Sequence, residues 1–146
     1  VDEPGFLIGP DAEKAGTILH GTEAVLATTE STVPWTTVMI RKSFGVAAAA
    51  HYGPDAYVLA WPSAESGPLP LEGGVAVAFK KEISEAEDPE AKRKELEEKM
   101  AKNQNPFPRA EAFSVHEIID PRETRKYISL WAERIQSQLK ASLMSR

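Results

Sequence analysis

The chain lacks several features that would place it in a familiar class. It has no cysteine, which excludes disulfides, thiolate nucleophiles and thiolate metal ligands. Its 22 acidic residues outnumber its 17 basic ones, which argues against nucleic acid as the main partner. No apolar run approaches the roughly 20 residues that cross a bilayer, and the first residues lack the pattern of a secretory signal. We therefore expect an intracellular protein without a membrane span.

The usual catalytic and cofactor-binding patterns are also missing. His20, His51 and His116 lie far apart, with none of the short spacings that place two metal ligands on one helix face. His20 is expected on a helix surface, and His51 at the end of a short helix, where it would interact with the helix dipole. There is no Walker loop, and Gly45 alone does not make a dinucleotide fingerprint. Any catalysis is therefore expected to use backbone donors, without a metal or a catalytic triad.

The segment from Val33 to Ala50, VPWTTVMIRKSFGVAAAA, is the most informative part of the chain. A β-rich run ends in Ser43, Phe44 and Gly45, and a helix-prone run of small residues follows directly. This order leaves free N–H groups at a helix N-terminus, where the helix dipole favours negative charge. Donors fixed in this way suit the stabilisation of an enolate or another oxyanion. A buried strand-turn-helix without a chemical role explains the same pattern, and it is preferred on local features alone.

Helical and extended segments alternate along the 146 residues, which are about one domain's worth. Strands separated by helices indicate an α/β fold with at least partly parallel pairing. Gly16 and Gly21 are expected to mark close packing of another backbone, and Asp88 and Asp120, each followed by proline, are predicted helix N-caps. The expected helices cover 10–31, 46–52, 71–83, 88–103 and the segment after 120, and the expected strands cover 33–42, 56–61 and 115–119.

Both ends of the chain predict contacts beyond it. Residues 1–9 read as the end of a strand that runs into a turn, with no earlier element to pair with. We therefore expect a portion of a longer or split subunit. The last helix places Ile128, Trp131, Ile135 and Leu139 on one apolar stripe, which predicts a core or subunit contact.

Four stretches of the chain together resemble a known family. They are VDEPGFLIGPDAEKAGTILHG, RKSFGVAAAA, AYVLAWPSAE, and the region from DPEAKRKELEEK to NPFPRAEAFSVHEIIDPRETR. In this combination they are similar to the carboxyltransferase β-subunits of biotin-dependent acyl-CoA carboxylases, with propionyl-CoA carboxylase as the nearest type. The resemblance implies an α/β, crotonase-like (ClpP/crotonase) fold built of ββα units. It also implies that residues 1–146 are the carboxy-terminal domain of a two-domain carboxyltransferase subunit.

The resemblance further implies carboxyl transfer from carboxybiotin to the α-carbon of an acyl-CoA, through enolates held by backbone oxyanion holes. Biotin would arrive on a separate carrier protein, and no metal is implied in this chain. An amino-terminal carboxyltransferase domain or subunit would complete each active site, so the chain alone would be inactive. Biotin carboxylase and biotin carrier subunits are the other implied partners, in a homo- or hetero-oligomer such as a hexamer. The implied compartment is the cytoplasm, or the mitochondrial matrix in a eukaryote.

Family site residues carry over to the turn after the central strand and to the first nine residues. The backbone of Val46 and Ala47 matches the biotin oxyanion hole, although the family usually has glycine in place of Val46. Ala49 stands where propionyl-specific members tend to have aspartate, which predicts a wider and less polar acyl pocket. The loop 67–70 replaces a common Met-Gly pair. The implied site residues are Val46 and Ala47 for catalysis, Phe44, Gly45 and Ala49 for substrate binding, and Gly5, Phe6 and Gly9 on the biotin side.

Three functions remain open at this point. The first is an active carboxyltransferase with an altered choice of acyl group, which Ala49 favours. The second is a non-catalytic assembly subunit with an eroded biotin site, which Val46 and the loop 67–70 favour because a branched side chain would crowd biotin and tolerates positive φ badly. The third is a biotin-independent enzyme acting on an acyl-CoA thioester. It is disfavoured because no Asp, Glu or His stands beside Gly45 in the sequence.

Overall fold

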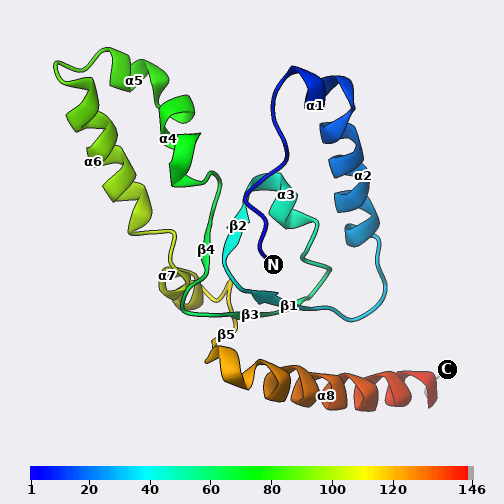
Figure 1. Cartoon of the computed structure of the whole chain (residues 1–146). Helices are drawn as coiled ribbons and strands as arrows, with labels where there is room; N and C mark the ends of the chain where they lie inside the picture. The colour runs from blue at the N-terminus through cyan, green and yellow to red at the C-terminus, as the bar shows by residue number, and fades with distance from the viewer. Residues whose placement is uncertain (145–146) are drawn as a thin grey trace.

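The computed structural model describes the backbone of residues 1–144, and their side chains except those of Glu72 and 141–144. Figure 1 shows short strands at the centre with helices extending from them. The strands are β1 (Thr36–Met39), β2 (Lys42–Phe44), β3 (Tyr57–Ala60), β4 (Glu65–Gly67) and β5 (Glu117–Ile118). The helices are α1 (Pro10–Lys14), α2 (Thr17–Thr29), α3 (Gly45–Ala49), α4 (Leu71–Ala78), α5 (Lys80–Ser84), α6 (Pro89–Ala101), α7 (Pro106–Glu111), the 3-10 turn η1 (Pro121–Glu123) and α8 (Thr124–Met144).

The strands form two parallel sheets, and the chain passes from one sheet to the other twice. One sheet has the order β1-β3-β5 and the other pairs β2 with β4. Each passage joins two successive strands and leads into a helix: β1, β2 and α3, then β3, β4 and α4. The two passages lie side by side, since the N–H of Glu65 donates to the carbonyl of Arg41. The architecture is therefore a pair of ββα units stacked in register.

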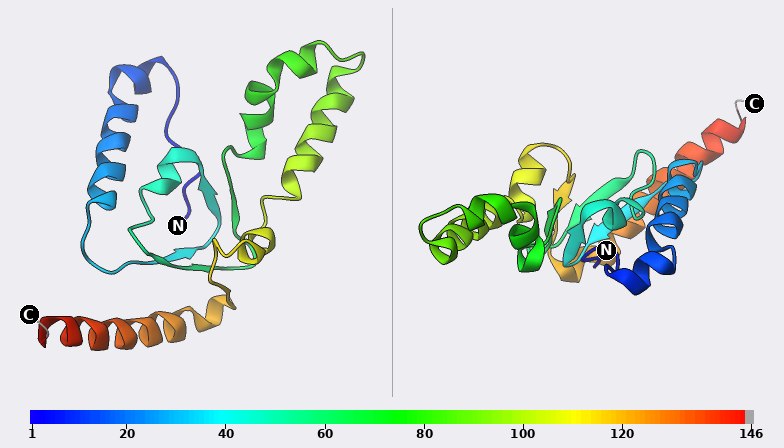
Figure 2. Two further views of the ribbon diagram at one scale, coloured as in Figure 1. Left: turned by 180° about the vertical axis from the view of Figure 1, so that it is seen from behind. Right: turned by 90° about the horizontal axis from the view of Figure 1, so that it is seen from above.

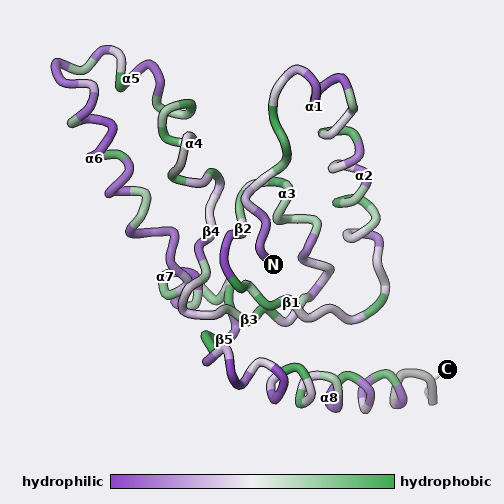
Figure 3. The backbone as a smooth tube through the Cα atoms, viewed as in Figure 1, coloured by the Kyte–Doolittle hydropathy of each residue, from purple (hydrophilic) through white to green (hydrophobic). Residues whose placement is uncertain are grey.

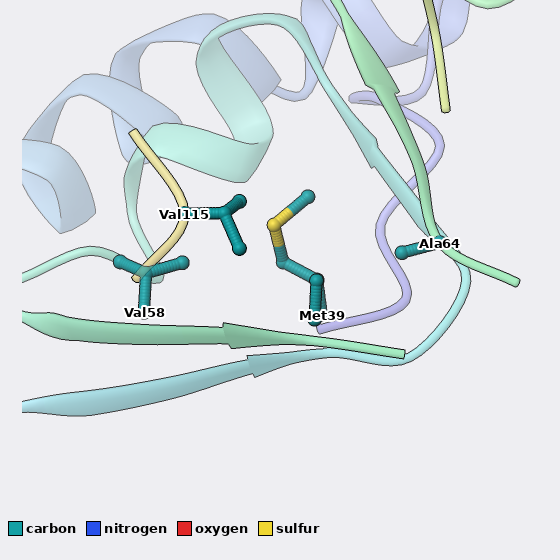
Figure 4. Close-up of a cluster of buried hydrophobic side chains, with 5 residues drawn as sticks. Met39, Val58, Ala64 and Val115 are labelled. Atoms are coloured by element: carbon teal, nitrogen blue, oxygen red, sulfur yellow. The ribbon is translucent and has the colours of Figure 1, made fainter. Parts of the chain in front are cut away.

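A small apolar core fills the corner between the two sheets. Figure 4 shows Met39, Val58, Ala64 and Val115 converging there from four segments of the chain. Met39 and Val115 are each 2% exposed. Full burial of a side chain of this size contributes about 1.5–3 kcal/mol to the stability of the fold. These residues therefore stabilise the bend after which β2 leads into α3.

Several helices extend away from the strands. In Figure 2, α1 and α2 rise on one side, α4, α5 and α6 form an arm on the other, and α8 projects from the base. Figure 3 shows that α6 is largely hydrophilic, whereas apolar and polar residues alternate along α8. No helix in the described part of the chain is long and apolar enough to cross a membrane.

The structure confirms the α/β class and both predicted caps. The Asp88 carboxylate accepts hydrogen bonds from the N–H groups of Glu90 and Ala91, at 3.1 and 3.0 Å. The Asp120 carboxylate accepts one from the N–H of Arg122, at 2.9 Å. The expected strand end at the N-terminus is also present, but it has a partner: Glu3 forms a parallel bridge with Ser43, at the edge of β2.

Several predicted boundaries are wrong, each for a local reason. The helix over 10–31 is two helices, because Gly16 adopts φ +74 between them. The strand over 33–42 is divided, since β1 ends at Met39 and Lys42 already begins β2 in the other sheet. The helix over 71–83 is interrupted at Phe79, and the helix over 46–52 runs instead from Gly45 to Ala49. Two further elements, β4 and α7, were not predicted.

The prediction that Gly16 and Gly21 mark close packing of another backbone is wrong at both positions. A Cβ at Gly21 would lie 2.3 Å from the Phe6 ring, so the close neighbour there is an aromatic side chain and not a backbone. Gly16 has no such contact, because the nearest atom to an added Cβ there lies 3.7 Å away. Its glycine is explained by the left-handed backbone alone.

Candidate functional site

The turn from β2 into α3 is the centre of the candidate site. Phe44 is extended, with φ −123, and Gly45 then adopts φ +62. A Cβ at Gly45 would also lie 3.3 Å from the carbonyl oxygen of Pro68. The left-handed backbone and the close carbonyl both favour glycine at this position.

The first turn of α3 presents backbone donors at the surface. The N–H groups of Gly45, Val46 and Ala47 have no acceptor within the helix, because they belong to its first turn. Among the described turn, loop and cap bonds, none has the N–H of Val46 or Ala47 as donor. The Ala47 side chain is buried, whereas Gly45 and Val46 are exposed. Two adjacent backbone donors at an exposed turn are suited to an oxyanion.

Val46 does not have the strained backbone that the sequence raised as a concern. The only described non-glycine residues with positive φ are Asp55 and Phe113. The positive φ falls on Gly45 instead, one residue earlier. The Val46 side chain is 63% exposed, so it extends from the turn into the space outside and leaves the N–H in place.

The other residues predicted at this turn divide between support and surface. Phe44 is 1% exposed, and a Cβ at Gly67 would lie 3.5 Å from its ring. Its side chain therefore anchors β2 against β4. Ala49 lies on the exposed side of α3. Of the two, only Ala49 is placed to contact a molecule bound at the turn.

Two hydroxyl groups support the turn from within. Ser43 Oγ and Tyr52 Oη are hydrogen-bonded at 2.8 Å, linking β2 to the chain after α3. Burial raises the pKa of Tyr52 above its ordinary value, and the Ser43 hydrogen bond opposes this change. The Tyr52 hydroxyl is therefore neutral at physiological pH and acts as a structural tie.

The first nine residues run beside this turn, with different outcomes for the three predicted there. The N–H of Phe44 donates to the Glu3 carbonyl at 3.0 Å, which brings the segment to β2. Gly5 and Gly9 adopt φ +133 and +114, and neither has an atom within 4 Å of an added Cβ. Phe6 packs on Gly21 of α2. The segment therefore bridges the turn and α2, with its glycines open and its phenylalanine packed.

An acid and a base that were not predicted from the sequence meet near the turn. His51 Nε2 lies 4.0 Å from Glu3 Oε2. The two residues are far apart in the chain, so only the Glu3–Ser43 bridge brings them together. A biotin-independent enzyme was disfavoured because no acid or base stands beside Gly45 in the sequence. The fold nevertheless brings an acid and a base together nearby, so that reason is incomplete. The only sequence signal for this pair was that the extended N-terminal segment carries an acid, Glu3.

The other two histidines have structural surroundings. His20 is exposed and pairs with Glu23 at 3.1 Å. His116 Nδ1 accepts a hydrogen bond from the N–H of Val58 at 3.0 Å, and its ring lies 5.2 Å from that of Tyr57. Within the described residues no three His, Cys, Asp or Glu side chains form a group that could hold a metal ion.

A cleft of about 450 Å³ lies away from the α3 turn. Its walls come from residues 31–35, Pro54, Asp55 and α8, to which Trp131 and Ile135 contribute. Ile128 and Leu139, from the same predicted stripe, are 36% and 46% exposed. Half of the stripe therefore borders a cleft within this chain, and the other half is open to the outside.

Comparison with known proteins identifies relatives along the whole length of the chain. The carboxyl transferase domain matches residues 1–144. The carboxyltransferase subunit of propionyl-CoA carboxylase from Haloferax mediterranei is 38% identical over 146 residues, covering 97% of this chain and 28% of that protein. The methylmalonyl-CoA carboxyltransferase 12S subunit of Propionibacterium freudenreichii subsp. shermanii is 42% identical over 134 residues, covering 88% and 25%. The chain spans about a quarter of the length of these relatives.

Solved structures give the same result. A transcarboxylase 12S crystal structure, described as a hexamer with methylmalonyl-coenzyme A and methylmalonic acid bound, superposes with a TM-score of 0.81. It is 40% identical and covers 94% of this chain and 27% of that one. The β-subunit of geranyl-CoA carboxylase from P. aeruginosa has a TM-score of 0.82 at 20% identity, over 90% of this chain and 26% of that one, which supports the fold alone.

Proposed function

The chain belongs to the carboxyl transferase domain family, and from that premise we propose that it is the carboxy-terminal domain of an acyl-CoA carboxyltransferase. Its fold is the crotonase-like fold of ββα units that the sequence predicted. Since the chain spans about a quarter of its curated relatives, the reaction of the whole protein and its partners are part of the proposal. The reaction is transfer of a carboxyl group from carboxybiotin to the α-carbon of an acyl-CoA.

The observation that carries the proposal is the exposed first turn of α3. The N–H groups of Val46 and Ala47 lie where the dipole of the helix and the absence of intrahelical acceptors favour a negatively charged oxygen. Bound carboxybiotin supplies the activated carboxyl group, and the two amides fit the ureido oxygen that must carry negative charge. Gly45 supplies the left-handed backbone through which β2 enters the helix.

The remaining predicted residues have supporting roles in this proposal. Phe44 holds β2 beneath the turn, and Ala49 borders the acyl group from the exposed side of α3. Gly5, Phe6 and Gly9 shape the biotin side through the segment that bridges to Ser43. Alanine at position 49 leaves room and removes charge, so acyl groups other than propionyl are accepted.

The missing part of the site comes from an amino-terminal carboxyltransferase domain or subunit. Several large apolar side chains support a buried role for this chain in a larger assembly. Leu7, Ile8 and Val77 are 79%, 88% and 76% exposed, and such groups in numbers mark contact surfaces. We place the chain in an oligomer, hexameric by analogy, with biotin carboxylase and biotin carrier subunits.

A non-catalytic assembly subunit is the second candidate. It is favoured by the branched Val46 side chain on the turn and by the loop 67–70, in which Leu69 is 38% exposed. Both would narrow the space for biotin. The helical backbone at Val46 keeps the donor, however, so the catalytic proposal is preferred.

The test is carboxyl transfer in the native complex that contains this chain. A panel of carboxylated acyl-CoAs is supplied with a biotin derivative, and decarboxylation is followed for each. Activity with a defined acyl preference supports the carboxyltransferase proposal and reports what Ala49 selects. An intact complex that is inactive, although its biotin carboxylase still works, would favour the assembly subunit. Turnover by the isolated 146-residue chain would contradict the shared site.

A further inference from the structure

A second pocket, of about 220 Å³, lies between β4 and the foot of the α4–α6 arm. Figure 1 shows α6 descending to α7 beside β4. The pocket is smaller than the roughly 300–1,000 Å³ that hold cofactors and drug-sized ligands. Its lining residues are Ser66, Gly67, Pro68, Met100, Asn103, Gln104 and Arg109.

Two polar atoms of this lining are buried without a hydrogen-bond partner. They are Ser66 Oγ and Arg109 Nε, and no other polar side-chain atom of the described residues is buried without a partner. Ser66 as a whole is 3% exposed. Buried polar groups are nearly always paired in native proteins, although Arg109 as a residue is only partly buried and Nε is the atom of its guanidinium that lacks a partner. Their coincidence in one pocket indicates that the pocket is built for a polar guest.

Gln104 and the backbone of Ser66 are already used in fixing the shape of the wall. Gln104 Nε2 donates to the carbonyl of Leu69 at 2.9 Å, and the N–H of Ser66 donates to the carbonyl of Gln104 at 2.8 Å. These bonds tie β4 and the loop after it to the end of α6. They leave Ser66 Oγ and Arg109 Nε without a partner, and Asn103 adds a side-chain amide to the same lining.

The charge of the pocket has one sign. None of its lining residues is Asp or Glu, and no ion pair among the described residues includes Arg109. A guanidinium presents several N–H donors in a fixed plane that matches carboxylate and phosphate oxygens. A hydroxyl adds one more donor. We propose that this pocket binds a small oxyanion, a carboxylate or a phosphate, through Arg109 and Ser66.

This site goes beyond the proposed carboxyl transfer and does not depend on it. It uses no residue of the α3 turn, although Pro68 borders both. Its failure would leave the carboxyltransferase proposal untouched, since the test below measures binding and not turnover.

The test titrates inorganic phosphate and, separately, malonate into the purified protein in the assembly in which it is isolated. Binding is followed by calorimetry and by the midpoint of thermal unfolding, with sodium chloride at equal ionic strength as the reference. We expect saturable binding of at least one anion. Phosphate binding more tightly would indicate a tetrahedral guest, and malonate a planar carboxylate.

Three variants assign the binding to the pocket. Arg109→Gln removes the charge and is expected to weaken binding at least tenfold, because a hydrogen bond to a charged group is lost. Ser66→Ala, a one-atom truncation, is expected to weaken it about fivefold. Arg125→Gln removes one positive charge from an exposed site of α8 and should leave the affinity unchanged.

The outcomes that overturn the proposal are also specific. The proposal is wrong if no anion binds saturably. It is also wrong if Arg109→Gln and Arg125→Gln lower the anion affinity equally, and in either case the pocket is a water-filled cavity. If Arg109→Gln does not fold, Ser66→Ala decides the question alone. Arg109→Met gives an independent reading: without anion it should unfold at the same or a higher temperature than the parent, since it removes a buried Nε that has no hydrogen-bond partner.

Discussion

Gly45→Ala is the substitution that most directly probes the geometry of the α3 turn. An L-residue at φ +62 costs about 1–2 kcal/mol. The added Cβ would also lie 3.3 Å from the Pro68 carbonyl oxygen, tighter than most real contacts, so either β4 or the turn must shift. A total of about 1–3 kcal/mol is expected, depending on how much of the shift the loop 67–70 absorbs. If the turn rotates to relieve the strain, the Val46 and Ala47 amides lose their common direction.

Gly16→Ala is the matched control for this change. Gly16 has a similar backbone, with φ +74, but an added Cβ there meets nothing nearer than 3.7 Å. The control should therefore lose about 1–2 kcal/mol of stability from the backbone alone and keep full carboxyl transfer. Both variants are measured by chemical denaturation and by the rate of decarboxylation in the native complex. Equal stability loss with full activity in both would refute the claim that Gly45 positions catalytic amides.

Three further predictions concern the surrounding fold. Burial, and then the hydrogen bond and charge of Glu117, raise the pKa of Tyr57 to about 12. The protonated phenol therefore stabilises the folded state below pH 10, and this contribution is lost as the pH rises to about 12. Glu117→Gln should lower the pKa of Tyr57 toward 10, as measured by tyrosinate absorbance. A Cβ in Gly53→Ala would lie 2.1 Å from the Trp35 ring, so unfolding by denaturant should show a loss of about 1–3 kcal/mol, and an unchanged midpoint would contradict that packing. Asp88→Ala removes the α6 cap and should lower the free energy of unfolding by about 1 kcal/mol. Identical thermal melts of the variant and the parent would contradict this prediction.

The sequence predicted the elements well where local signals were strong. Asp88 and Asp120 form the caps expected of them, because an N-cap is decided by two or three neighbouring residues. The α/β class and the strand-turn-helix at Gly45 were also readable, since a buried strand followed by glycine and small residues leaves few other structures.

The corner between the two sheets could not be read from the sequence. Val38, Met39 and Ile40 form one apolar run, yet β1 ends at Met39 and the chain changes sheets after it. The bend is fixed by distant partners, such as the N–H of Trp61 donating to the Met39 carbonyl. The strand β4 was not predicted for the same reason, because it is formed by pairing with β2, a segment distant in the sequence.

The roles of the site residues stay predictions. The family resemblance assigned backbone donors to Val46 and Ala47, which lie in the first turn of α3, and substrate binding to Phe44, whose side chain is buried in this chain. It also missed the meeting of Glu3 and His51, which depends on a single bridge between segments forty residues apart. Local sequence can predict a turn, whereas the side chains that approach it from elsewhere are decided by the fold.

The central claim is that backbone donors of the α3 turn carry the carboxyltransferase chemistry, and removing one N–H tests it most directly. Val46→Pro deletes that donor at the second position of the helix, where proline is compatible with a helical first turn. Val46→Ala trims the same side chain and keeps the donor. Carboxyl transfer in the native complex is expected to fall about 100- to 1,000-fold in Val46→Pro and to change little in Val46→Ala. Equal activity in the two variants would contradict the account.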